Sequence, residues 1–141
     1  MSANSKKMLL AWLIALFGTL GSLYFSDVMG FVPCLLCWYQ RVALYPLVVI
    51  LPIGILRQDS NAAVYALPLV IIGALIAFYQ NLLVWQVIPT GAWCGSLGSC
   101  ANGYINWFGF VTIPLLSLLA FSMIIILLVS ISRQRLARNI N

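Results

Sequence analysis

Four long runs of uncharged, mostly apolar residues alternate with short polar stretches along this 141-residue chain. A helix needs about 20 apolar residues to cross the hydrocarbon core of a membrane, and each run is close to that length. The apolar residues are continuous and do not alternate with polar ones, as the strands of a membrane β-barrel would require. The pattern therefore predicts an all-α membrane protein, a four-transmembrane-helix bundle in a single domain over residues 1–141. The expected helices cover about residues 8–25, 34–56, 62–85 and 108–131.

Composition agrees with this prediction, because 64% of the residues are hydrophobic and only 6% are charged. Soluble domains are roughly 45–50% apolar. Lys6 and Lys7 precede the first run as they would in a signal peptide. However, "GSLYFSDVMG" offers no A-x-A-like cleavage site, and the run of 18 residues exceeds a usual signal-peptide core. We expect a retained helix, with cleavage as the alternative.

The basic residues predict the orientation of the bundle. Six of the seven fall on one side of the predicted membrane: Lys6, Lys7, Arg57, Arg133, Arg135 and Arg138. Cytoplasmic loops carry the excess of lysine and arginine, so both termini are expected in the cytoplasm. The net charge of +5 is then an orientation signal and a contact with anionic lipid, and it does not indicate a nucleic-acid site.

Four cysteines, Cys34, Cys37, Cys94 and Cys100, fall in the two loops expected outside the cytoplasm. Disulfides form and persist there, since thiols are not held reduced. Four cysteines allow three connectivities. The cost of loop closure favours the local pairs Cys34–Cys37 and Cys94–Cys100, and pairing between the two groups stays open as a transient state.

The stretch "PCLLCWYQR" combines one of these pairs with a lone positive charge. Pro33 suits the first position of a helix. Cys34, Cys37 and Arg41 then lie on one helix face, with Arg41 about 6 Å deeper than Cys37. The helix N-terminus and the arginine both favour a thiolate, which is the nucleophile in disulfide exchange.

Two thiol pairs on one side of a membrane predict a relay that passes two electrons by sequential disulfide exchange. The glycine-rich loop of residues 86–107 is accessible to a soluble protein, and the other pair to a lipid-dissolved carrier. No G-x-G-x-x-G and no histidine are present, so a quinone is the carrier that fits. Alternatives are two inert disulfides, an arginine that only extends to the membrane surface, and a four-cysteine zinc site.

The segments "GSLYFS", "PCLLCWYQR" and "YINWFGFVTIP" resemble the DsbB-like thiol:quinone oxidoreductases, and most closely their BdbC-like branch. The resemblance covers essentially the whole chain. It implies a four-helix protein of the bacterial cytoplasmic membrane without a metal. It also implies a DsbA- or BdbD-like thioredoxin-fold partner, and menaquinone or ubiquinone as the electron acceptor.

The resemblance also implies roles for individual residues. Cys94 would form the mixed disulfide with the partner, and Cys100 would attack Cys34. The released Cys37 thiolate would meet the quinone beside Arg41, whose charge would stabilise the developing negative charge.

This chain departs from many relatives at two positions near that site. Gln80 stands where they carry a histidine late in the third helix, and it can hydrogen-bond a quinone carbonyl but cannot deliver a proton. Gln40 stands where some relatives have an acid. Two rival hypotheses are a vitamin K epoxide reductase-like relay and a non-catalytic scaffold with two structural disulfides.

Overall fold

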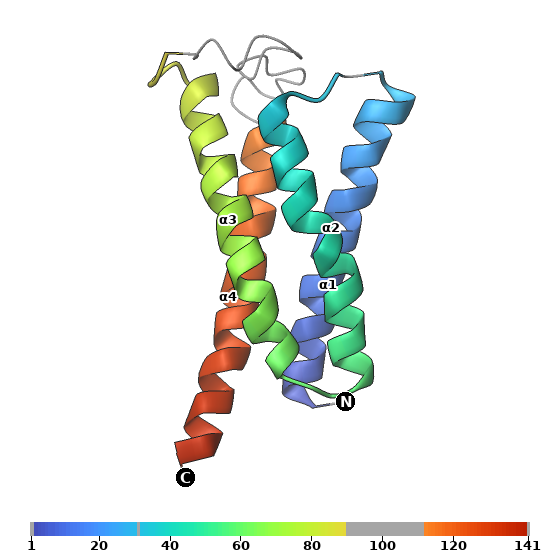
Figure 1. Cartoon of the computed structure of the whole chain (residues 1–141), viewed down its shortest axis with the longest axis vertical. Helices are drawn as coiled ribbons and strands as arrows, with labels where there is room; N and C mark the ends of the chain where they lie inside the picture. The colour runs from blue at the N-terminus through green and yellow to red at the C-terminus, as the bar shows by residue number, and fades with distance from the viewer. Residues whose placement is uncertain (1, 31, 90–111, 141) are drawn as a thin grey trace.

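Four long helices make up the fold in a computed structural model that describes residues 2–30, 32–89 and 112–140. They are α1 (Ala3–Leu23), α2 (Leu35–Leu56), α3 (Asn61–Val84) and α4 (Ile113–Ile140) (Figure 1). A π-helical turn, η1 (Tyr24–Val28), continues α1. Within these described ranges there is no β-strand, and all four helices are long and apolar enough to cross a membrane. The predicted all-α bundle of four membrane helices is confirmed.

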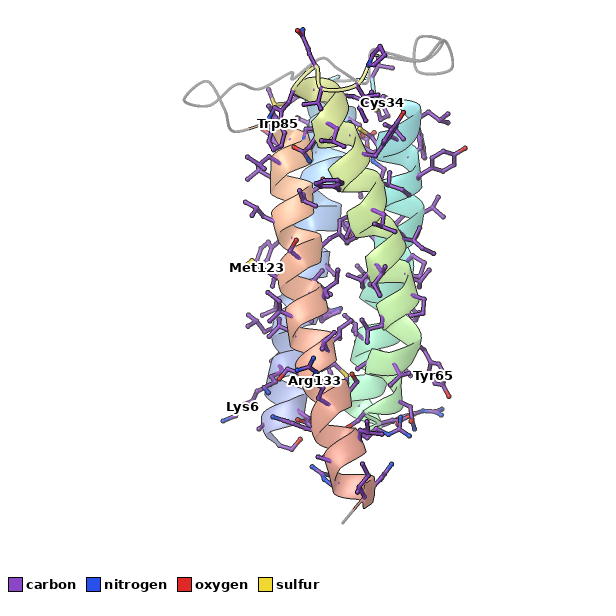
Figure 2. The ribbon with its side chains drawn as sticks, turned by 90° about the vertical axis from the view of Figure 1, so that its left-hand side faces the viewer. Lys6, Cys34, Tyr65, Trp85, Met123 and Arg133 are labelled. Atoms are coloured by element: carbon purple, nitrogen blue, oxygen red, sulfur yellow. The ribbon has the colours of Figure 1, made fainter. Side chains whose placement is uncertain are left out.

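Each helix packs against two neighbours, in the cyclic order α1, α2, α3, α4. Both termini and the α2–α3 connection lie at one end of the bundle, and η1 and the start of α2 lie at the other (Figure 1). Figure 2 accordingly shows Lys6 and Arg133 toward one end, with Cys34 and Trp85 at the opposite end. The structure thus separates the basic segments from the first cysteine pair along the bundle axis. We call the end that carries Cys34 the cysteine end.

The helix boundaries differ from the sequence-based expectation chiefly in the first and fourth helices. The first helix begins at Ala3 and not at residue 8, and the Ser2 hydroxyl caps it by accepting a hydrogen bond from the Ser5 backbone N–H at 3.2 Å. The fourth helix begins at Ile113 and not at residue 108, and it continues to Ile140 and not to residue 131. Lysine and arginine are good helix formers, so the helices extend past the apolar segments into their basic flanks.

Small residues allow the helices to approach closely. Ala63, Ala66, Ala77 and Gly73 are all buried on α3, which packs against both α2 and α4. A Cβ added at Gly73 would lie 2.5 Å from the Phe121 ring of α4. Close packing of this kind drives helix association in membranes, where lipid tails are as apolar as the helix surfaces.

A proline inside α2 is compensated by a neighbouring helix. Pro52 has no N–H, so the carbonyl of Val48 loses its partner within the helix. The indole Nε1 of Trp12 on α1 donates a hydrogen bond to this carbonyl oxygen at 3.1 Å. Such substitution by a neighbour is how membrane helices tolerate internal prolines.

Candidate functional site

An apolar cavity of about 280 Å³ lies between the helices at the cysteine end. Aromatic side chains of α1, η1 and α4 form much of its wall: Phe17, Phe25 and Phe121. Polar groups also reach the wall, and they come from all four helices: Ser22, Cys34, Cys37, Gln40, Arg41, Gln80 and Ser117. A mostly apolar chamber with a few convergent polar groups is the usual form of a small-molecule site.

The first cysteine pair lies at the N-terminal end of α2. The helix begins at Leu35 and not at Pro33, because Cys34 is the N-cap residue with an extended backbone (φ −72°, ψ 169°). Cys37 is in the first turn, and the two sulfur atoms are 3.2 Å apart. The hydrogen bond to Cys37, together with burial, raises the pKa of the Cys34 thiol above its ordinary value. Cys34 therefore keeps its proton more firmly than a free cysteine would.

Arg41 lies one helical turn deeper than Cys37 and is 8% exposed. Its Nε donates to the Ser22 hydroxyl at 2.7 Å, and its Nη2 donates to the Ser22 carbonyl at 2.8 Å. The guanidinium carbon also lies 5.4 Å from the centre of the Trp38 ring, within cation–π distance. These contacts hold the charge inside the bundle at the cavity wall. Its guanidinium thus reaches the end of α1 near the cysteine end of the bundle.

Two glutamines join the cysteine pair to the middle of the bundle. Gln40 Nε2 donates to Gln80 Oε1 at 2.6 Å, and Gln80 Nε2 lies 3.4 Å from both Cys34 Sγ and Cys37 Sγ. Gln40 is 8% exposed and Gln80 is 3% exposed. Hydrogen bonds between buried amides are strong and directional, because no water competes for the same groups.

The structure brings four of the predicted site residues together at one cavity, namely Cys34, Cys37, Arg41 and Gln80. Cys94 and Cys100 lie outside the described residues. Across the described ranges, no group of three metal-binding side chains could hold a metal ion.

Ser22, which holds Arg41, was not identified from the sequence. Its one signal is a small polar residue directly after a glycine in a mostly apolar run, a pattern that Thr19 shares, and that signal does not indicate which helix it contacts. Gln40 was noted only as a difference from relatives. Its neighbour in space is 40 positions away in the chain, so local patterns could not reveal the contact.

Comparison with known proteins identifies the family. The family model described as disulfide bond formation protein DsbB matches residues 5–131. This chain belongs to the DsbB family. It is 49% identical over 119 residues to disulfide bond formation protein C of Bacillus subtilis, covering 82% of this chain and 85% of the relative. It is 47% identical over 130 residues to a probable disulfide formation protein C of Halalkalibacterium halodurans, covering 91% and 94%. No solved structure gives a significant match.

Membership of the DsbB family and the four apolar helices together make the chain a multi-pass membrane protein. The resemblance to the BdbC-like branch is also confirmed, since the relatives are disulfide formation proteins C at close to half identity. The vitamin K epoxide reductase-like hypothesis is set aside by this match.

Proposed function

We propose that this chain is a membrane thiol:quinone oxidoreductase. It reoxidises a DsbA- or BdbD-like thioredoxin-fold protein outside the cytoplasm and passes two electrons to a membrane quinone. The cysteine end then faces outward and the basic end faces the cytoplasm of a bacterial cell, in accord with the distribution of lysine and arginine. The observation that carries the proposal is the position of the Cys34–Cys37 pair and Arg41 on the wall of one apolar cavity.

The residues around the cavity fit a quinone. A quinone head group is a flat ring with two carbonyl oxygens, and its tail is apolar. Aromatic rings suit its faces, and Arg41 and Gln80 offer N–H donors to its oxygen atoms. Arg41 also presents a fixed positive charge, which favours a ligand that becomes more negative on reduction. When bound, a quinone supplies a two-electron acceptor that takes up two protons.

The thiol steps balance without a further reagent. The partner's dithiol reduces the Cys94–Cys100 disulfide and becomes oxidised itself. Attack by the Cys100 thiolate on Cys34 Sγ then breaks the Cys34–Cys37 bond, and Cys37 leaves with the electron pair. When Cys94 displaces Cys34 from Cys100, the Cys94–Cys100 disulfide forms again and Cys34–Cys37 remains as a dithiol. Oxidation of that dithiol releases two electrons and two protons, which is what quinone reduction consumes.

The proposal is tested with the purified protein in lipid, a reduced DsbA-like protein and a soluble quinone, followed by quinone absorbance. We expect turnover in the wild type, none in Cys37→Ser and less in Arg41→Ala. If quinone is not consumed and both disulfides survive exposure to the reduced partner, the non-catalytic scaffold is the correct function. If the partner is oxidised without quinone loss, the electron acceptor in this proposal is wrong.

A further inference from the structure

The Gln40–Gln80 pair has no place in the thiol steps above, yet it contacts both reacting sulfur atoms. Gln80 comes from α3 and reaches across to the start of α2, where its Nε2 is 3.4 Å from each sulfur. Gln40 is on α2 one turn below Cys37 and meets the other end of the same amide. The arrangement is a short chain of hydrogen bonds from one buried side chain through a second to the cysteine pair.

The direction of this chain matters because an amide has two different ends. Its NH2 group only donates, and its carbonyl oxygen only accepts. Gln40 offers an N–H to Gln80, so the carbonyl oxygen of Gln80 turns toward Gln40 and the NH2 group turns toward the sulfurs. In the opposite orientation the two NH2 groups would face each other, and the Gln80 oxygen would face the sulfurs.

The two orientations of the Gln80 amide differ most in energy when one of the sulfur atoms is a thiolate. Cys37 leaves as a thiolate each time its disulfide opens, and it does so in a half-buried site where an unpaired charge is costly. An N–H donor stabilises the thiolate, whereas a carbonyl oxygen repels it. Hydrogen bonds to charged groups are also stronger than those between neutral groups.

We propose that Gln80 is a catalytic residue that stabilises the thiolate of the Cys34–Cys37 pair, and that Gln40 is a positioning residue that fixes the donor end of Gln80 toward the sulfurs. The inference rests on the proposed thiol relay for its purpose, but the arrangement exists without partner or quinone. It gives Gln80 a role at the cysteines in addition to its place in the quinone cavity. This chain has no histidine, and the uncharged amide of Gln80 would be a hydrogen-bond donor to the thiol pair.

The test measures the reactivity of the two thiols directly. The full chain carries Cys94→Ser and Cys100→Ser, is held in lipid under anaerobic reducing conditions, and is alkylated with iodoacetamide across a range of pH. The pH of half-maximal rate reports how readily the thiolate forms, and peptide mass spectrometry identifies the modified cysteine. Among the described residues, other ionisable groups line this site or the pocket beside it: Arg41 and Tyr45 on α2, Asp27 on η1 and Tyr79 on α3. All of them are unchanged in every variant.

Methionine is the matched replacement, because it has nearly the length and volume of glutamine but no N–H donor. In Gln80→Met we expect the half-maximal pH to rise by about one unit, which is about tenfold in rate at a fixed lower pH. In Gln40→Met we expect a smaller rise in the half-maximal pH. Gln80 is still present in this variant, but its amide is free to rotate and its NH2 group no longer faces the sulfur atoms all the time. The double variant should match Gln80→Met, because Gln40 acts only through Gln80. Ser122→Ala, which removes a hydroxyl bonded to its own helix, should leave the profile unchanged.

An unchanged profile in folded Gln80→Met overturns the proposal. The positioning role of Gln40 is overturned if the double variant has a half-maximal pH above that of Gln80→Met by the same amount as Gln40→Met is above the wild type. If Gln80→Met does not fold, Gln80→Leu is read in the same way, with circular dichroism as the check on folding. Neither partner nor quinone is present, so failure here is distinct from failure of quinone reduction, and either can occur without the other.

Discussion

The contact between Gly73 and Phe121 provides a stringent test of how α3 and α4 pack. A Cβ placed on Gly73 would lie 2.5 Å from Phe121 Cε1 and 2.6 Å from Cζ. Both atoms belong to one rigid ring, so the ring must move as a whole to admit a methyl group. Phe121 is 2% exposed and lines the cavity, which gives the ring space into which it can move. Gly73→Ala should therefore force the ring toward the cavity.

The size of the effect follows from two opposing contributions. Adding a methylene to a well-packed core costs about 1–3 kcal/mol. Replacing glycine by alanine inside a helix recovers about 0.5–1 kcal/mol of conformational free energy. We therefore expect Gly73→Ala to lower the free energy of unfolding by about 0–2.5 kcal/mol. Because the displaced ring narrows the cavity, we also expect a higher KM for quinone.

The assay is thermal unfolding in lipid followed by circular dichroism, for Gly73→Ala, Phe121→Leu and the double variant. If the ring is the obstacle, the loss in Gly73→Ala should largely disappear once Phe121 is leucine, which gives a measurable coupling between the sites. Gly21→Ala is the stability control, since its added Cβ would meet nothing within 4 Å apart from its chain neighbours and the backbone of its own helix. Additive effects of Gly73→Ala and Phe121→Leu in the double variant would refute this account of the packing.

Two further substitutions test individual contacts. Arg41→Lys keeps the charge but cannot bind the hydroxyl and carbonyl of Ser22 with one planar group, so we expect kcat/KM for quinone to fall about tenfold, measured by quinone absorbance. If Arg41→Lys has the kinetics of the wild type, the two hydrogen bonds from the guanidinium to Ser22 are not needed for quinone reduction, which would contradict this prediction. Trp12→Phe should cost about 1–3 kcal/mol in unfolding, because the Val48 carbonyl loses its donor. Pro52→Ala should offset that loss by restoring the helical N–H, and a double variant no more stable than Trp12→Phe would count against the explanation.

Much of the fold was predictable from the sequence because the membrane leaves few alternatives. Backbone groups must be satisfied within each spanning segment, so a run of about 20 apolar residues has to be a helix. The ends of the helices were less predictable, since the apolar run marks the hydrocarbon core and the helix continues beyond it. Arg133 and Arg138 show this, because both lie on α4 itself rather than on a tail that follows it.

The candidate site was predictable where its residues share one helix. Cys37 and Arg41 are four positions apart on α2, so helical geometry alone places them on one side of that helix. Cys34 precedes α2 as its N-cap residue, and its sulfur still lies 3.2 Å from that of Cys37. Contacts between helices were not predictable in this way. Nothing in the spacing of Ser22 indicates that it receives the guanidinium, because its position depends on how α1 rotates against α2.

Hydrogen bonds between helices at the cysteine end both hold the bundle together and orient its polar groups, so a variant that removes one of them can affect a distant side chain. Among the described residues, such bonds link neighbouring helices at three points. Arg41 bonds Ser22 of α1 twice, Gln80 bonds Gln40 and Cys37 of α2, and Asn81 bonds Pro114 of α4. In lipid no water replaces a lost partner, so each bond both holds two helices together and fixes the direction of a polar group. Asn81 is fully buried and adjacent in sequence to Gln80, and its bond sets how α3 lies against α4. A change at Asn81 should therefore alter the reactivity of the cysteines without touching them, because the donor that faces the sulfurs is carried on the helix that Asn81 holds in place.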